Sequence, residues 1–309
     1  MYIEEFLPEG RLINSEKNKS LTASKDTLRE ALHKEKIVEG IAIICDAEHN
    51  LTVNFGTFTG IIPHNEAALG IDNGKTREIA IISRVGRAVS CMVTDITPNG
   101  TVILSRKKAQ QKALSNFFDT KRPGDIIPAT VTHLEPFGAF CDIGCGNISL
   151  LGIETLSISR ISHPSDRFSE GDDIFAVITA LDCENKRVFL SHRELLGTWD
   201  ENIKKFTSGE TVRGTVRGVE EYGIFVELAP NLSGLAEFRD DVSVGDSISV
   251  FIKNIIPEKM KIKLVIIDKL PSAPKQRISP ADYFITSGHI SSWCYSPTYS
   301  ERKKGESFF

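Results

Sequence analysis

The sequence predicts a mainly β protein made of three tandem five-stranded barrels joined by short helices. The pattern Phe137-Gly138-Ala139-Phe140 returns 85 residues later as Tyr222-Gly223-Ile224-Phe225. Each copy follows a glycine and an acid at the same distance, Gly124-Asp125 and Gly209-Glu210. Short apolar runs separated by glycine-rich turns surround both copies, with no long helical core between them. Such a repeat favours small closed barrels, because closure removes exposed sheet edges.

The two clear repeats contain the same strands in the same order. In the middle repeat we expect strands at 126–134, in the aromatic segment that ends at 143, at 174–178 and at 186–191. In the last repeat we expect them at 212–219, in the aromatic segment that ends at 228, at 248–252 and at 261–264. Apolar and polar residues alternate along 212–217, which is typical of a strand with one buried face.

A fainter copy precedes these two repeats. Residues 38–56 align without gaps on residues 126–144. In this copy His49 takes the place of Phe137, and Thr52 takes the place of Phe140. The first barrel is therefore expected to lack the aromatic pair and to mediate protein contacts or stiffen the array.

Three helices are expected between and before the barrels. Residues 106–118 and 193–206 precede the two clear repeats, and 106–118 consists of good helix formers. Residues 24–37 fit an amphipathic helix with Ser24 as its N-cap. The expected divisions are an N-terminal segment with a helix (1–36), a degenerate barrel (37–109), a helical linker (110–122), a barrel (123–194), a second helical linker (195–207), a third barrel (208–268) and an aromatic-rich tail (269–309).

The tail has two readings. Residues 271–275 read as a linker, and the aromatic-rich stretch beyond them is too apolar for simple disorder. The stretch either packs back on the third barrel or the N-terminal segment, or serves as a docking peptide for a protein partner.

Composition excludes several classes of protein. No apolar run approaches the ~18 residues of a membrane span, and the N-terminus lacks the order of a signal peptide, so we expect a cytoplasmic protein without a membrane partner. The six cysteines are scattered, which argues against a zinc site and against disulfides. The seven histidines fall singly, and no motif for a nucleotide or a catalytic nucleophile is present. We therefore expect no enzyme, no cofactor and no metal.

The two clear repeats resemble the S1 RNA-binding domain, an OB-fold family named after bacterial ribosomal protein S1. The resemblance rests on the following segments: Gly124-Asp125, Phe137-Gly138-Ala139-Phe140, Arg160-Ile161-Ser162-His163-Pro164, Gly171-Asp172, Arg187-Val188-Phe189-Leu190-Ser191 and, in the last repeat, Ser233-Gly234-Leu235. A short protein with three repeats fits this resemblance better than a full-length repeat array. It implies three OB-fold barrels and a role in translation or RNA metabolism.

The resemblance also implies which residues bind nucleic acid. The family's two aromatics correspond to Phe137 and Phe140 in the middle repeat, and to Tyr222 and Phe225 in the last. Its Asp/Arg pair corresponds to Asp182 and Arg187, whereas the last repeat has Ile256 and Lys261 in those places. The family's histidine is absent, since Gly152 and Glu237 stand at its two positions. Further cations on the strands complete the candidate RNA-binding set: Arg213, Arg217 and Lys263.

Two functions follow. The first is non-enzymatic binding of single-stranded RNA, with messenger RNA or the ribosome as possible partners, because an unpaired base can stack on an aromatic ring. The second is a protein-interaction scaffold, and charge favours it: residues 123–194 hold five Lys and Arg against eleven Asp and Glu, and residues 208–266 hold seven against nine. A basic stripe beside the rings would favour RNA. Strand alternation leaves open whether one ring of each pair belongs to the core.

Overall fold

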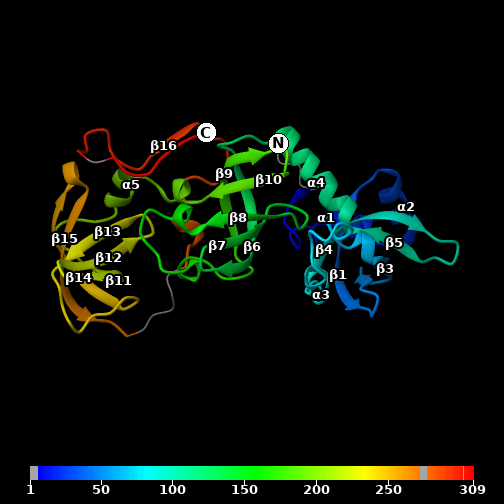
Figure 1. Ribbon diagram of the computed structural model, residues 1–309, viewed down its shortest axis with the longest axis horizontal. Coiled ribbons are helices and arrows are strands. Elements are labelled where there is room, and N and C mark those ends of the chain that lie inside the picture. Colours follow the sequence, from blue (N-terminus) through cyan, green and yellow to red (C-terminus); the bar gives the residue numbers. More distant parts are fainter. Residues whose placement is uncertain (1–5, 272–276, 302) are drawn as a thin grey trace. The chain divides into compact units, whose positions relative to one another are not determined.

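Three closed five-stranded barrels follow one another along the chain in a computed structural model that describes residues 6–271, 277–301 and 303–309 (Figure 1). The predicted fold class is confirmed. Except for Pro271, the predicted linker lies outside the described residues. Barrel 1 consists of β1 (Ile37–Cys45), β2 (Leu51–Asn54), β3 (Thr59–Ile62), β4 (Ala88–Ile96) and β5 (Val102–Ser105). Barrel 2 consists of β6 (Ile126–Glu135), β7 (Gly138–Asp142), β8 (Ile148–Gly152), β9 (Asp173–Asp182) and β10 (Arg187–Ser191). Barrel 3 consists of β11 (Thr211–Glu220), β12 (Gly223–Ala229), β13 (Leu232–Ala236), β14 (Ser247–Ile256) and β15 (Lys261–Lys269).

The chain forms two compact units. The first holds barrel 1 together with residues 128–130 and 142–148, and the second holds the rest of barrel 2, barrel 3 and the C-terminal segment. In each barrel the third strand pairs with the fifth, in parallel, and this pairing closes the sheet. Among the helices in the described ranges, none is long and apolar enough to cross a membrane.

Strand alternation decides what the barrels bury. In β15 the side chains of Ile262, Leu264 and Ile266 enter the barrel, while Lys261 and Lys263 point outward. A period of two is also clear in β3, β8 and β14, whereas β1, β4 and β12 contain longer buried runs. Each barrel has an aliphatic interior, and the outward positions of the alternating strands are free to vary.

The glycine of the aromatic motif is required by the neighbouring strand. A Cβ added at Gly138 would lie 2.5 Å from the carbonyl oxygen of Leu151, and one at Gly223 would lie 2.5 Å from that of Ala236. Two strands can approach this closely only where one of them carries no side chain. The glycine therefore serves strand packing and does not leave space for a ligand.

Helices lie where the sequence predicts them, with different ends. The expected helix at 106–118 is α4 (Arg106–Thr120), and the one at 24–37 is α2 (Lys25–His33). Ser24 caps α2 through a capping box with Thr27. Residues 193–206 form a 3-10 turn (Arg193–Leu196) and α5 (Trp199–Ile203), because Gly197 between them has φ 78°. Two further short helices, α1 (Glu16–Leu21) and α3 (Ile79–Ile82), were not predicted.

In the first unit an ion pair fixes the N-terminal segment to α4. The Glu9 carboxylate accepts hydrogen bonds from Arg106 Nε at 2.7 Å and from Nη2 at 3.0 Å, and both side chains are 6% exposed. The Glu9 backbone N–H in turn donates to Asp142 Oδ2. Burial raises the pKa of Asp142 to about 7. Residues 142–148 are thereby joined to the N-terminal segment and α4.

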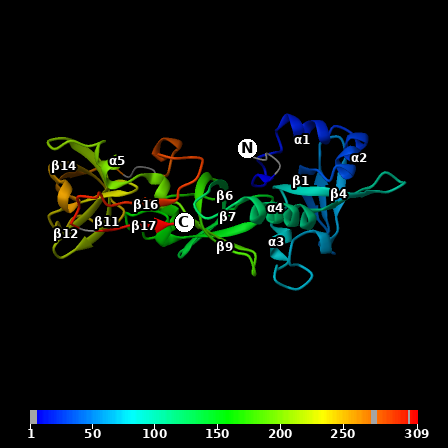
Figure 2. The ribbon, with the colours of Figure 1, turned by 90° about the horizontal axis from the view of Figure 1, so that it is seen from above.

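In the second unit the C-terminal segment packs back on the barrels, beside α5 (Figures 1 and 2). Its two short strands, β16 (Ser292–Cys294) and β17 (Glu306–Phe308), pair with each other. Tyr295 is 5% exposed, accepts the Trp199 N–H through its carbonyl, and donates its hydroxyl to the Asn231 carbonyl oxygen at 2.5 Å. The side chain of Asn231 accepts the Ile158 N–H at 2.9 Å. Barrel 2, barrel 3 and the tail therefore share one hydrophobic core.

A buried ionic network also links barrels 2 and 3. The Glu227 carboxylate in β12 accepts hydrogen bonds from both terminal nitrogens of Arg167 and from Nε of Arg217, the last at 2.6 Å. Asp166 lies 3.3 Å from Nη1 of Arg217. The side chains of Arg167, Glu227 and Arg217 are 1%, 3% and 8% exposed. Because barrel 2 contributes Arg167 and Asp166 and barrel 3 contributes the other two, the network fixes one barrel against the other.

Candidate nucleic-acid interface

Both aromatic pairs lie on the barrel surface. The rings of Phe137 and Phe140 have centroids 6.1 Å apart at 89°, and those of Tyr222 and Phe225 have centroids 6.0 Å apart at 87°. Phe137 is 55% exposed and Tyr222 is 70% exposed. Strand alternation does not separate the rings, because Phe137 and Tyr222 precede β7 and β12 and belong to the turns. No ring of either pair is therefore enclosed in a barrel core.

The strand residue beside each aromatic pair is apolar in barrel 2 and cationic in barrel 3. In barrel 2 Phe189 is the neighbour of Leu150 across β8 and β10, and it is 47% exposed. In barrel 3 the matching neighbours are Lys263 and Leu235. Barrel 2 therefore presents an apolar face, and barrel 3 combines rings with positive charge. Phe189 was not among the residues predicted to bind RNA, although its outward place in an alternating strand signals it.

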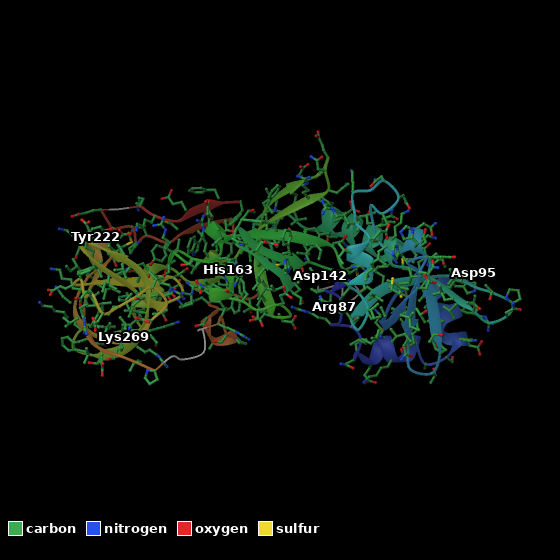
Figure 3. All side chains as sticks on the ribbon, turned by 60° about the horizontal axis from the view of Figure 1, so that its bottom comes forward. Arg87, Asp95, Asp142, His163, Tyr222 and Lys269 are labelled. Carbon is green, nitrogen blue, oxygen red and sulfur yellow. The ribbon has the colours of Figure 1, made fainter. Side chains whose placement is uncertain are left out.

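A groove of about 1390 Å³ runs beside Tyr222 and Phe225 in the second unit. Barrel 3 forms most of its wall, residues 153–161 of barrel 2 form another part, and Tyr295 and Lys304 of the C-terminal segment complete it. Figure 3 labels Tyr222 on the side of barrel 3 away from Lys269. Trp199 of α5 also lines the groove, which is thus built from segments that are distant in the sequence.

Positive charge predominates in this groove. Six cationic residues line it outside the ionic network: Arg160, Lys253, Lys259, Lys261, Lys263 and Lys304. They face three carboxylates: Glu154, Glu220 and Glu237. Within the described ranges, none of the six cations forms an ion pair. Cationic groups beside two exposed rings are the combination that suits binding of a phosphate backbone with unpaired bases.

The structure brings together only part of the predicted site in barrel 3. Tyr222, Phe225, Lys261 and Lys263 line the groove. Arg217 also touches it, but its guanidinium belongs to the buried network with Glu227 and Asp166 and has a structural partner already. Arg213 lies outside the groove, where its Nε donates to Ser247 Oγ at 2.8 Å. Four cations that line the groove were not predicted to bind RNA: Arg160, Lys253, Lys259 and Lys304.

In barrel 2 the predicted Asp/Arg pair flanks a turn. Asp182 and Arg187 are directly opposite each other in the pairing of β9 with β10. The Asp182 carboxylate accepts hydrogen bonds from the Glu184 and Asn185 N–H groups and from Asn185 Nδ2. The hydrogen bonds from Asn185 lower the pKa of Asp182 most, and the nearby Arg187 charge adds to the effect. Asp182 therefore shapes the turn that presents the exposed Arg187.

Comparison with known proteins agrees with this architecture. Residues 120–193 match the family model of the S1 RNA binding domain. The chain is 33% identical over 193 residues to small ribosomal subunit protein bS1 of Leuconostoc lactis, covering 57% of this chain and 45% of that protein. It is 27% identical over 298 residues to bS1 of Staphylococcus epidermidis, covering 91% and 73%. The chain thus spans less than half of the first of these relatives and about three quarters of the second.

Among solved structures, a multidomain protein with nucleic acid binding domains from Streptococcus pneumoniae matches 75% of this chain and 73% of its own, with 13% identity and a TM-score of 0.25. The motifs of the middle and last repeats, the three closed barrels, the domain match over 120–193 and the similarity over most of the chain agree with one another. Residues 120–193 therefore match the S1 RNA-binding domain, and the chain resembles bacterial ribosomal protein S1.

Proposed function

We propose that this protein binds single-stranded RNA without catalysing a reaction, and that the groove of barrel 3 is its principal RNA-binding site. The observation that carries the proposal is the coincidence, in one groove, of two exposed rings with six cations that form no ion pair among the described residues. The resemblance to bS1 supports an RNA-binding protein that is associated with the ribosome, and we propose that it acts in the cytoplasm. The divisions at 37–109, 123–194 and 208–268 are proposed as the three S1-type domains.

The rings select unpaired bases. Tyr222 and Phe225 meet nearly at a right angle and are both accessible, so that one base stacks on a ring face while the next turns across the edge. A base within a duplex has no free face, and duplexes are therefore excluded. Stacking contributes about 1–3 kcal/mol per base with little sequence preference.

The lysines hold the backbone beside those rings. Lys261 and Lys263 point to the same side of β15 because they are two residues apart, and Lys253 lies on the neighbouring strand β14. Phosphates bound there release counterions, which makes the affinity depend on salt. The acidic balance of the whole chain does not oppose this, because cations outnumber carboxylates within the groove itself.

The test is fluorescence anisotropy of a labelled single-stranded RNA, compared with the matching duplex and with single-stranded DNA, over a salt series. We expect binding to the single strand that weakens as salt rises. In the variant Tyr222→Ala/Phe225→Ala the dissociation constant should rise about 5- to 150-fold for each stacked base that is lost.

The matched control is Phe137→Ala/Phe140→Ala, which removes the equivalent pair from barrel 2. That pair has Phe189 beside it where barrel 3 has Lys263, so we expect a much smaller loss of RNA affinity. An equal loss in both variants would contradict the assignment to barrel 3. Absence of binding by the wild-type chain at low salt would remove RNA binding altogether.

A protein-interaction scaffold is the second candidate, and the face of barrel 2 favours it. Phe137, Phe189 and Leu150 are exposed together, at 55%, 47% and 38%. The surrounding barrel has more than twice as many acidic as basic residues. An apolar patch in an acidic domain suits a protein partner better than a nucleic acid. Loss of ribosome co-sedimentation in Phe137→Ala/Phe189→Ala, with RNA affinity unchanged, would assign protein contact to this face.

A further inference from the structure

Barrel 1 brings together three potential metal ligands in the place where the other barrels carry their first aromatic ring. His49 lies in the turn between β1 and β2, His64 begins the 3-10 turn after β3, and Glu78 immediately precedes α3. His49 aligns with Phe137 of barrel 2. Both histidines are isolated in the sequence, because these three residues belong to separate segments. Among the residues that the structure describes, they form a cluster of metal-ligating side chains.

The donor atoms have the spacing of a metal site. Glu78 Oε2 lies 3.0 Å from His49 Nδ1 and 2.9 Å from His64 Nε2, and all three donors are within 4.8 Å of one another. Ligands about 2.0–2.1 Å from a tetrahedral ion are about 3.3 Å apart. Small movements of the side chains are therefore enough to place an ion among them. The side chains are 36–45% exposed, so an ion can enter from solvent.

Neighbouring hydrogen bonds hold the two histidines in place. The Asp46 carboxylate accepts the Glu48 and Asn50 N–H groups and also Asn50 Nδ2, at 2.8–2.9 Å. The Asn50 side-chain oxygen accepts the His64 N–H at 3.0 Å. The turn thus stays in the conformation that gives His49 a φ of 61° and is joined directly to the backbone of His64. Such supporting interactions reduce the entropy that binding an ion would cost.

We propose that His49, His64 and Glu78 bind a divalent transition metal ion, with Zn²⁺ as the best match. Two imidazoles and one carboxylate suit Zn²⁺, Co²⁺ or Ni²⁺, whereas Mg²⁺ and Ca²⁺ require oxygen ligands. On binding, His49 Nδ1 and His64 Nε2 give their lone pairs to the ion, and each neutral ring keeps its proton on the other nitrogen. The ion joins the β1–β2 turn to the segment before α3. In barrel 1 a metal ion thus occupies the surface that carries stacking rings elsewhere.

The experiment titrates the full chain with ZnCl₂ in competition with a chromophoric chelator. All proteins carry Cys183→Ser, because Cys183 is an exposed thiol that can bind zinc on its own. We expect one Zn²⁺ ion per chain, and at least about a tenfold loss of affinity in His49→Asn. Asparagine tolerates the left-handed conformation at this position, so the variant removes the imidazole and retains the turn.

The matched control is His133→Ala on barrel 2. The two ring nitrogens of His133 contact different carboxylates, Glu170 at 2.8 Å and Glu135 at 3.1 Å, so no single ion can bind all three groups. We expect this variant to bind zinc like its parent. Zinc should also raise the melting temperature of the parent and of His133→Ala, but not that of His49→Asn. Absence of zinc binding, or equal zinc affinity in His49→Asn and its parent, would overturn the proposal.

Discussion

Replacing Glu227 by Gln should strongly destabilise the second unit. The Glu227 carboxylate is the common partner of Arg167 and Arg217, whose side chains are 1% and 8% exposed. With a neutral amide in its place, Arg167 has no carboxylate partner in the network, and Arg217 has only Asp166 at 3.3 Å. Breaking a buried ion pair on one side costs about 3–5 kcal/mol, since the remaining charge stays buried. For a unit of this size that corresponds to a fall in melting temperature of roughly 6–20 °C.

Urea denaturation followed by tryptophan fluorescence measures this effect selectively. The chain has two tryptophans, Trp199 and Trp293, and both are buried in the second unit. Barrel 1 contains none, so its unfolding does not contribute to the signal. The matched control is Asp241→Asn, which removes an exposed ion pair with Arg239 in the same barrel and should leave the midpoint unchanged. If Glu227→Gln unfolds at the same urea concentration as the wild type, the network does not stabilise the contact between barrels 2 and 3, and the prediction is wrong.

Three further predictions follow from single contacts. Lys261→Gln/Lys263→Gln should make the slope of log K against log salt shallower by about 1.4 for single-stranded RNA, as an anisotropy salt series will measure. Burial lowers the pKa of His192 to about 4, so the unfolded chain takes up a proton first as the pH falls. The contribution of His192 to the free energy of unfolding of the second unit should be complete above pH ~6.5 and fall by up to about 3 kcal/mol between pH ~6.5 and pH ~4. Urea denaturation at each pH will measure this fall, which should be absent from His192→Asn. Gly223→Ala should cost about 1–3 kcal/mol in the same assay, because the new Cβ meets the Ala236 carbonyl oxygen at 2.5 Å.

The fold could be predicted because its strands and turns follow from local sequence patterns. Strand alternation, glycine turns and the repeated aromatic motif each depend on residues near one another in the sequence, and they occur twice in clear form. The exposure of both rings could not be settled in the same way. It depends on Phe137 and Tyr222 belonging to turns, and strand ends are defined by pairing partners elsewhere in the chain.

The candidate site was predicted only in part, for a similar reason. Lys261 and Lys263 lie on a strand whose outward face could be derived from its alternation. Arg217 lies in a strand with the same alternation, yet its side chain contacts Glu227 and Asp166 where barrels 2 and 3 meet. No local sequence pattern indicates these contacts. The contribution of Arg160 to the groove depends on how two barrels and the tail pack together. Long-range packing therefore decides which cations remain available to RNA.

The three barrels have the same strand arrangement but different surfaces, and the contact between barrels 2 and 3 completes the groove of barrel 3. Equivalent outward positions carry His49, Phe137 and Tyr222, and these replacements leave the aliphatic interiors intact because they face solvent. Barrel 3 alone does not complete its groove, since Arg160 comes from barrel 2 and Lys304 from the tail. A base on Tyr222 and a phosphate on Arg160 can be bound together only while the two barrels hold one relative position. The buried Arg167–Glu227–Arg217 network maintains that position, so the proposed RNA affinity depends on Arg167 and Glu227, which do not line the groove.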